Sequence, residues 1–110
     1  MKYEIKYTAA AKQDLYDIHE YIAFCLLAPV SAGKLIKRIT KAIRSLEELP
    51  LRHRLYEEEP WHSRGIRVFP VNHYLIFYVV REQESTVTVM RIVYERRDLV
   101  QQLQEITFDH

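Results

Sequence analysis

The stretch that decides the fold is residues 65–94, which read GIRVFPVNHYLIFYVVREQESTVTVMRIVY. Three runs within it, at 66–69, 74–80 and 86–94, are rich in β-branched and aromatic residues and are typical of strands. The links between them, at 70–73 and 81–85, have the length of hairpin connections. These features predict a three-stranded antiparallel meander.

The N-terminal side of the chain begins with one more strand. Tyr3, Ile5 and Tyr7 alternate with charged residues over the segment 2–7, which is the pattern of a half-buried strand. Thr8 follows this strand and is expected to cap a helix.

Two amphipathic helices are predicted between this strand and residue 50, because apolar residues recur there at steps of three and four. The first apolar stripe consists of Ala11, Leu15, Ile18, Ile22 and Cys25. The second consists of Leu35, Ile39, Ala42, Ile43, Leu46 and Leu49. Pro29 and Pro50 are expected to follow the two helix ends, and Ser31 to cap the second helix. The short connection favours an antiparallel helical hairpin.

The predicted order is strand, helix, helix and three strands, which defines an α+β domain with both helices packed on one sheet face. At 110 residues the chain has the size of a single domain, residues 1–110. Leu99 and Leu103 fit a short C-terminal helix. We therefore expect an ordered core over residues 1–104 and a tail over 105–110.

Composition excludes several classes of protein. Two glycines are too few for a phosphate-binding loop or a dinucleotide fingerprint, so no nucleotide cofactor is expected. One cysteine allows neither an internal disulfide nor a cysteine-rich metal site, which favours a reducing, cytoplasmic location. The longest uncharged runs, 21–33 and 68–80, fall short of the ~20 residues that a membrane-spanning helix needs. A net charge of +1 is low for a protein that acts mainly through phosphate contacts.

The sequence offers little for metal binding or nucleophilic catalysis. No two of the five histidines have the three-to-five-residue spacing of metal ligands, so no metal site is expected. Cys25 is predicted to be a buried apolar residue and His19 a solvated one. The carboxylates at 57–59 precede a proline and are expected to form a solvated loop.

Arginines on the predicted strands are the remaining candidates for chemistry. Arg67 and Arg91 are expected to project from the sheet face opposite the helices. The residues near them in the pattern are His73, Tyr94, Arg96 and Arg97. Two interpretations remain open: this face holds a phosphate for transesterification, or it is the polar, water-facing side of an antiparallel sheet.

Several segments in the right order resemble the RelE/ParE superfamily of bacterial toxins. They are Tyr3–Thr8 with Ala11, Asp14 and Leu15, then Ser45–Pro50, Gly65–Tyr78 and Val87–Leu99 with its closing Arg97-Asp98. The resemblance covers residues 1–100 and implies the toxin of a type II toxin–antitoxin module. It further implies growth inhibition, with roles in plasmid stabilisation and stress response. The implied partner is a cognate antitoxin whose disordered segment folds on binding. Operator DNA would be bound only indirectly, through the antitoxin.

The superfamily has two main activities, and Leu75 bears on the choice between them. RelE-like members are ribosome-dependent mRNA endonucleases and carry an arginine directly after the tyrosine of the penultimate strand, where this chain has Tyr74-Leu75. ParE-like members inhibit DNA gyrase and are not nucleases. The segment Arg67–Val71 before Tyr74, together with the Arg97-Asp98 ending, looks ParE-like.

The leading hypothesis is a ParE-like toxin that binds a gyrase subunit by protein–protein contact. The candidate contact residues are Lys34, Lys37, Lys41, Arg96, Arg97, Asp98, Leu99 and Leu103. We also expect the unbound protein to expose an apolar groove that the antitoxin covers.

Two alternatives remain. One is a RelE-like endoribonuclease acting with ribosome and mRNA, in which Arg67 and Arg91 hold phosphate, His73 is the general acid or base, and Tyr94 contacts substrate. The other is a non-toxic homologue that survives as a binding module.

Overall fold

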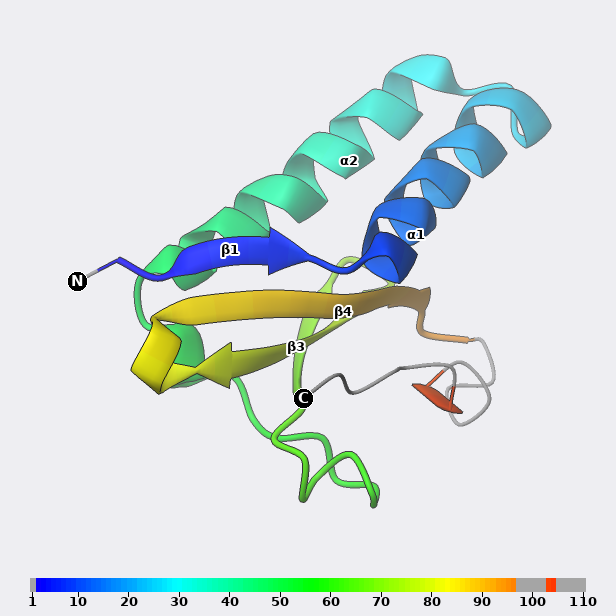
Figure 1. The fold of residues 1–110 in the computed structure, drawn as a ribbon. Coiled ribbons are helices and arrows are strands. Elements are labelled where there is room, and N and C mark those ends of the chain that lie inside the picture. Colours follow the sequence, from blue (N-terminus) through cyan, green and yellow to red (C-terminus); the bar gives the residue numbers. More distant parts are fainter. Residues whose placement is uncertain (1, 97–102, 105–110) are drawn as a thin grey trace.

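The computed structural model describes residues 2–96, 103 and 104, and consists of a four-stranded sheet with a helical hairpin packed on one face (Figure 1). The helices and their connecting π-helical turn are α1 (Ala9–Glu20), η1 (Tyr21–Cys25) and α2 (Pro29–Arg44). The strands are β1 (Glu4–Tyr7), β2 (Arg67–Val71), β3 (Tyr74–Arg81) and β4 (Thr86–Tyr94). The predicted α+β architecture is confirmed. Of the predicted C-terminal helix the structure describes Leu103 and Gln104, both helical; Leu99 and the tail at 105–110 lie outside the described residues.

The predicted meander forms with boundaries close to those expected. β2 pairs with β3 from Arg67↔Tyr78 to Val71↔Tyr74, and β3 pairs with β4, both antiparallel. Asn72 and His73 make the two-residue turn between β2 and β3. Asn72 takes a left-handed conformation with φ of 54°, which asparagine tolerates better than most residues.

The N-terminal strand completes the sheet at the edge beside β4, giving the strand order β1-β4-β3-β2. β1 is parallel to β4, with Glu4 opposite Thr86 and Tyr7 opposite Val89. Thr8 then caps α1 as predicted, since its Oγ1 accepts from the backbone N–H of Ala11 at 3.0 Å. The same hydroxyl donates to the carbonyl of Met90 at 2.8 Å, so the cap also ties the start of α1 to β4.

Both faces of the sheet carry apolar clusters. On the helix side the buried residues are Ala11, Ile39, Ile43, Val71, Ile76, Val89 and Ile92. On the other side they are Trp61, Ile66, Val68, Phe77, Val79, Met90, Val93 and Leu103. Trp61 covers this second face and donates its indole N–H to the carbonyl of Leu103 at 3.3 Å. The interpretation of the second face as a polar, water-facing surface is therefore wrong.

The ends of α2 differ from those predicted. The helix starts at Pro29, with Ala28 rather than Ser31 at the N-cap, because proline is suited to the first helical position, where its missing N–H has no partner to lose. After Arg44 the helix tightens into a 3-10 turn, Ser45–Glu47. Leu49, predicted to close the apolar stripe, is 74% exposed and adopts a left-handed conformation before Pro50.

The predicted burial of Cys25 is also wrong. α1 does not end as an α-helix but widens into η1, where the N–H of Leu26 reaches back to the carbonyl of Tyr21 at 3.1 Å. A π turn holds more residues than an α turn and rotates the following side chains around the helix axis. Ala23 is consequently buried and Cys25 is exposed. Within the described residues, no helix has the length and apolar character to cross a membrane.

Candidate partner-binding groove

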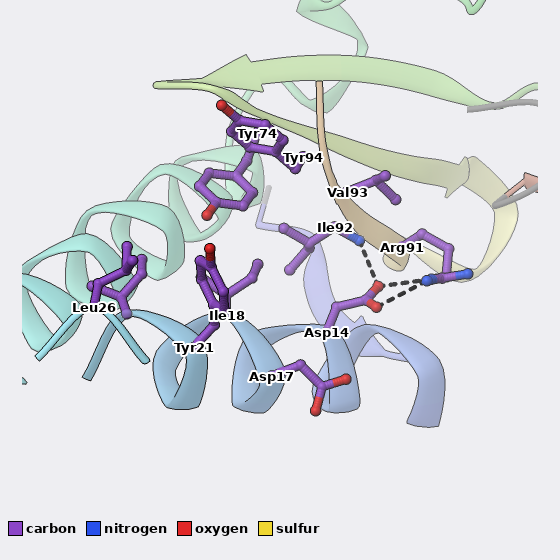
Figure 2. Close-up of a pocket in the computed structure, with 11 residues that line it drawn as sticks. Asp14, Asp17, Ile18, Tyr21, Leu26, Tyr74, Arg91, Ile92, Val93 and Tyr94 are labelled. Atoms are coloured by element: carbon purple, nitrogen blue, oxygen red, sulfur yellow. Dashed lines mark hydrogen bonds and ion pairs between the residues drawn. The ribbon is translucent and has the colours of Figure 1, made fainter. Parts of the chain in front are cut away.

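An open groove of about 660 Å³ lies between α1 with η1 on one side and the end of the sheet on the other (Figure 2). The helical wall consists of Asp14, Asp17, Ile18, Tyr21, Ile22 and Leu26. The sheet wall consists of Tyr74 at the start of β3 and of Arg91, Ile92, Val93 and Tyr94 at the end of β4. We expected an exposed apolar groove that the antitoxin covers; this groove is open, its lining combines apolar and polar groups, and its occupation by an antitoxin stays a prediction.

The groove forms here because β1 is shorter than β4. The β1 pairing stops at Val89, so the rest of the β4 edge lacks a strand neighbour on that side. α1 takes the place of a strand: the backbone N–H of Ile92 donates to Asp14 Oδ2 at 2.8 Å. A bulge lies at the same point, since Phe77 pairs with Arg91 and Tyr78 with Val89, which leaves Met90 as the extra residue.

Asp14 and Arg91 form the main polar contact of the groove. Arg91 Nε donates to Asp14 Oδ2 at 2.7 Å and Nη2 donates to Oδ1 at 2.9 Å, a bidentate geometry (Figure 2). Both side chains are nearly buried, with 10% and 12% exposed. The two charges neutralise each other, so the pair holds α1 against β4 and leaves the groove floor without net charge.

The walls of the groove are mainly aromatic and aliphatic. Tyr74 and Tyr94 contact each other edge to face, with ring centroids 5.5 Å apart. Tyr94 is 36% exposed and Tyr21, on the opposite wall, is 57% exposed (Figure 2). Tyrosine combines a large apolar ring with a polar hydroxyl, a combination enriched at protein interfaces.

One carboxylate in the groove has no cationic partner. Asp17 is exposed and accepts a hydrogen bond from Gln13 Nε2 at 2.8 Å, but no ion pair within residues 2–96, 103 and 104 involves it. The groove therefore combines apolar side chains and tyrosines with one negative charge at its rim that no ion pair among the described residues compensates. Such a lining suits a segment of apolar side chains with a basic residue among them.

The four predicted catalytic residues do not share one face. Arg91 and Tyr94 line the groove, and His73 lies beside the end of β4, with its backbone carbonyl accepting from Glu95 N at 2.9 Å. Its Nδ1 lies 2.9 Å from Glu95 Oε1, and its side chain is 71% exposed. Arg67 lies at the opposite end of β2, across from Tyr78.

The prediction that Arg67 and Arg91 project from the sheet face opposite the helices is wrong for Arg67 and holds for Arg91. Arg67 shares its sheet face with Phe69, which packs toward the helical cluster, and its Nη1 donates to the carbonyls of His53 at 2.7 Å and Leu51 at 3.4 Å. Arg91 lies at the bulge opposite Phe77, so it leaves the sheet from the second face, and its guanidinium reaches Asp14 of α1 at the β4 edge. The buried cluster that covers the second face is otherwise apolar.

Leu75 packs against the apolar cluster on the second sheet face and is partly buried. The carboxylates at 57–59 are exposed in a loop, as predicted.

The predicted contact residues fall into three groups. Lys34, Lys37 and Lys41 are exposed along α2, and Arg96 is exposed after β4. Leu103 is fully buried in the second-face cluster, which contradicts its assignment as a partner contact. Arg97, Asp98 and Leu99 lie outside the described residues. Within the described part of the chain, no three side chains of metal-ligand type come together.

Asp14 and Tyr21 are among the groove residues that were not predicted as site residues from the sequence. Asp14 lies three residues after Ala11 and four before Ile18, on the edge of the apolar stripe, and a carboxylate at such a position requires a buried partner. That spacing was the available signal for an ion pair. No sequence pattern indicated that Tyr21 would line the groove, because its position depends on the π turn.

The chain belongs to the family described as ParE toxins of type II toxin–antitoxin systems, whose model matches residues 5–99. The resemblance to the RelE/ParE superfamily, with the ParE branch as the nearer, is thereby confirmed. No curated protein matches the sequence.

Three solved structures share this fold at low sequence identity. The chromosomal ParDE system from P. aeruginosa matches with 20% identity and a TM-score of 0.69, over 84% of this chain and 96% of that one. The RelBE2 toxin–antitoxin complex of Mycobacterium tuberculosis matches with 17% identity and a TM-score of 0.65, over 86% and 92%. A mutant of the E. coli toxin RelE in the free state matches with 12% identity and a TM-score of 0.65, over 93% of each chain.

Proposed function

We propose that this toxin inhibits DNA gyrase by protein–protein contact and is neutralised by a cognate antitoxin that occupies the groove between α1 and β4. One observation supports a mechanism other than RNA cleavage: the positions considered for phosphate binding hold arginines that already have partners within the chain, or an apolar residue. Arg91 is bound to Asp14, Arg67 donates to two backbone carbonyls of its own chain, and Leu75 is an apolar residue packed against the second-face cluster.

A nuclease needs charge-assisted contacts to the scissile phosphate. Loss of one such donor commonly costs ~2.7–4 kcal/mol of transition-state stabilisation, about a hundredfold or more in rate. Here the three strand positions considered for that role are occupied by two engaged arginines and one leucine. The net charge of +1 adds little general attraction for RNA.

The antitoxin part of the proposal rests on the groove and on the relatives. The structures from P. aeruginosa and Mycobacterium tuberculosis are described as toxin–antitoxin systems or complexes. The groove has the apolar walls and exposed tyrosines that receive an amphipathic segment. Asp17 would pair with a basic side chain of that segment.

Two assays test the target. In a supercoiling reaction the purified toxin should prevent gyrase from supercoiling relaxed plasmid, and pre-incubation with the antitoxin should restore activity. In a translating ribosome extract, primer extension should show no toxin-dependent mRNA cuts. Codon-spaced cuts that disappear in Arg67→Ala or His73→Ala would overturn the proposal.

A second candidate function keeps one observation in its favour. His73 is held by Glu95 at 2.9 Å with its ring exposed, next to the end of β4 that carries Tyr94, an arrangement suited to proton transfer. This is the ribosome-dependent endoribonuclease, and the same extract assay decides it. A toxin inactive in both assays would be a non-toxic binding module.

The groove is tested separately by antitoxin affinity. Tyr94→Asp and Ile18→Asp place a charge in the apolar walls and should weaken antitoxin binding by about tenfold or more in isothermal titration calorimetry. Tyr16→Asp is the matched control, since Tyr16 is 60% exposed on α1 and does not line the groove. Equal affinity of all three variants would place the antitoxin elsewhere.

A further inference from the structure

The tip of the helical hairpin exposes a group of large apolar side chains. Phe24, Leu26, Leu27 and Val30 are 65%, 55%, 83% and 69% exposed, and they lie within seven consecutive residues where η1 leads into α2 (Figure 1). Single exposed apolar residues are ordinary on soluble proteins, but a contiguous group marks an interaction site. We call these four residues the hairpin tip.

Leu27 is the most unusual member of the tip. Its φ is 54°, a left-handed conformation that costs a non-glycine residue on the order of 1 kcal/mol and that asparagine or glycine adopts more easily. A leucine that is both strained and 83% exposed contributes little to the fold. Its side chain is therefore best explained by a contact with another molecule.

The outward face of α2 continues this surface with unpaired positive charges. Val30, Lys34, Lys37 and Lys41 follow one another at i, i+4, i+7 and i+11, so they form one row along the helix. Arg38 and Arg44 flank the row, and α2 contains no acidic residue. Within the described part of the chain, none of these five cations takes part in an ion pair. Like charges at these spacings destabilise a helix, so the compensating anions are expected from outside.

We propose that the hairpin tip and the lysine row form one docking surface for a protein that offers an apolar pocket bordered by acidic residues. This inference rests on the proposed function and assigns the surface to contact with the toxin's target. Phe24 and Leu27 would fill the pocket, and Lys34, Lys37 and Lys41 would pair with the acidic border. An apolar centre with a charged rim is the usual anatomy of a protein interface.

The shape of the surface favours a protein over a nucleic acid or a membrane. Phosphate groups offer nothing for Phe24, Leu26 and Leu27 to bury against. A bilayer would take the tip, but a helix bound at a membrane surface carries its apolar residues and its lysines on opposite faces, whereas Val30 and the three lysines lie in one row. Only a partner with both an apolar pocket and an extended acidic border would contact the hairpin tip and all three lysines together.

The surface also connects with the antitoxin groove. Leu26 belongs to the tip and lines the groove, whereas Leu27 and the three lysines do not line it. An antitoxin in the groove would therefore obstruct the tip at Leu26, and changes at Leu27 or the lysines should spare antitoxin binding. This difference separates the two surfaces experimentally.

Two variants of the full chain test the proposal. One is Leu27→Asn with Phe24→Ser, in which asparagine suits the left-handed conformation. The other is Lys34→Glu with Lys37→Glu and Lys41→Glu. The matched control is Lys2→Glu with Lys6→Glu and Lys12→Glu, which makes the same charge change at exposed residues away from the surface. Retained antitoxin affinity, measured by calorimetry, shows that each variant is folded.

Both test variants should raise the toxin concentration for half-inhibition of gyrase supercoiling by about tenfold or more, while the control stays within about twofold of the unmodified toxin. Test variants that inhibit as well as the unmodified toxin would overturn the docking surface and leave the proposed function standing. An unmodified toxin that does not inhibit gyrase would overturn the proposed function and this inference with it. Test variants that still inhibit gyrase but bind duplex DNA or phosphatidylglycerol vesicles less well than the unmodified toxin would overturn the proposal and assign the surface to nucleic acid or membrane binding.

Discussion

Asp14 and Arg91 lie 77 positions apart in the sequence and form a bidentate ion pair, at 2.7 and 2.9 Å, between α1 and β4. The same carboxylate accepts from the backbone N–H of Ile92 at 2.8 Å, at the point where β1 no longer covers the β4 edge. One acidic side chain thus satisfies an unpaired strand edge and neutralises a nearly buried guanidinium. It also fixes the distance between the two walls of the groove.

Asp14→Ala should therefore cost about 3–5 kcal/mol of the free energy of unfolding, because it removes the bidentate carboxylate from a nearly buried guanidinium. Urea denaturation followed by circular dichroism measures the loss. Asp17→Ala, the neighbouring exposed acid of the groove, should change stability by no more than about 0.5 kcal/mol. A loss below ~1 kcal/mol for Asp14→Ala would mean that the pair contributes little.

Much of the fold could be predicted from sequence because its signals are local. The β-branched and aromatic runs at 66–69 and 86–94, the Thr8 cap and most of the two helical stripes depend on neighbouring residues and have their counterparts in the structure. Cys25 and Leu49, at the ends of the stripes, do not. Leu75 likewise bears on function through its residue type alone, since it stands where RelE-like members carry an arginine. Its packing against the cluster that contains Trp61 agrees with its apolar character.

The groove could not be predicted in the same way because it depends on long-range geometry. The parallel pairing of β1 with β4 joins residues about eighty positions apart, and its length decides where the β4 edge becomes available to α1. The contact of Arg91 with Asp14 depends in turn on the place of α1 beside that edge, which alternation along β4 cannot anticipate. The second sheet face was misassigned for a related reason, since Trp61 comes from a segment whose charges suggested only a solvated loop.

Tyr78→Phe should make the protein less sensitive to alkaline pH. Burial raises the pKa of Tyr78 above its usual 10.0, although the nearby Arg67 opposes the rise, and its hydroxyl donates to the carbonyl of Pro50 at 2.7 Å. A raised pKa gives stability that is complete below pH 10 and is lost as pH rises through the folded-state value. The variant should lose about 1 kcal/mol near neutrality, where the hydrogen bond is missing.

The measurement for Tyr78 is the difference in unfolding free energy between the two proteins, taken at neutral pH and above pH 10. Tyr7 and Tyr56 also have a raised pKa through burial, so both proteins should weaken at high pH. Their effect cancels in the difference, which should shrink as pH rises. A difference that stays constant or grows would mean that Tyr78 ionises as easily in the folded state as in the unfolded one.

His53→Phe should reduce the loss of stability in mild acid. Burial, with a smaller effect of Arg52, lowers the pKa of His53 below 6.5, and the ring stacks on Phe69 with centroids 3.8 Å apart. A lowered histidine pKa gives stability that is complete above pH 6.5 and is lost as pH falls through the folded-state value. Phenylalanine keeps the stack without titrating. Thermal melts on either side of pH 6.5 should show a smaller acid shift for the variant than for the unmodified protein.

Cys25 should react with a thiol reagent in the folded protein. The π turn at Tyr21–Cys25 rotates the side chain out of the apolar stripe and leaves it exposed. Ellman's reagent should therefore label the single thiol in native buffer at a rate close to that in urea. Cys25→Ser should shift the free energy of unfolding by no more than about 0.5 kcal/mol, since no packed contact is lost. Labelling that requires denaturant would mean that Cys25 is buried in the apolar stripe and that the π turn is absent. The position of Tyr21 in the groove and the exposure of the hairpin tip both depend on that turn.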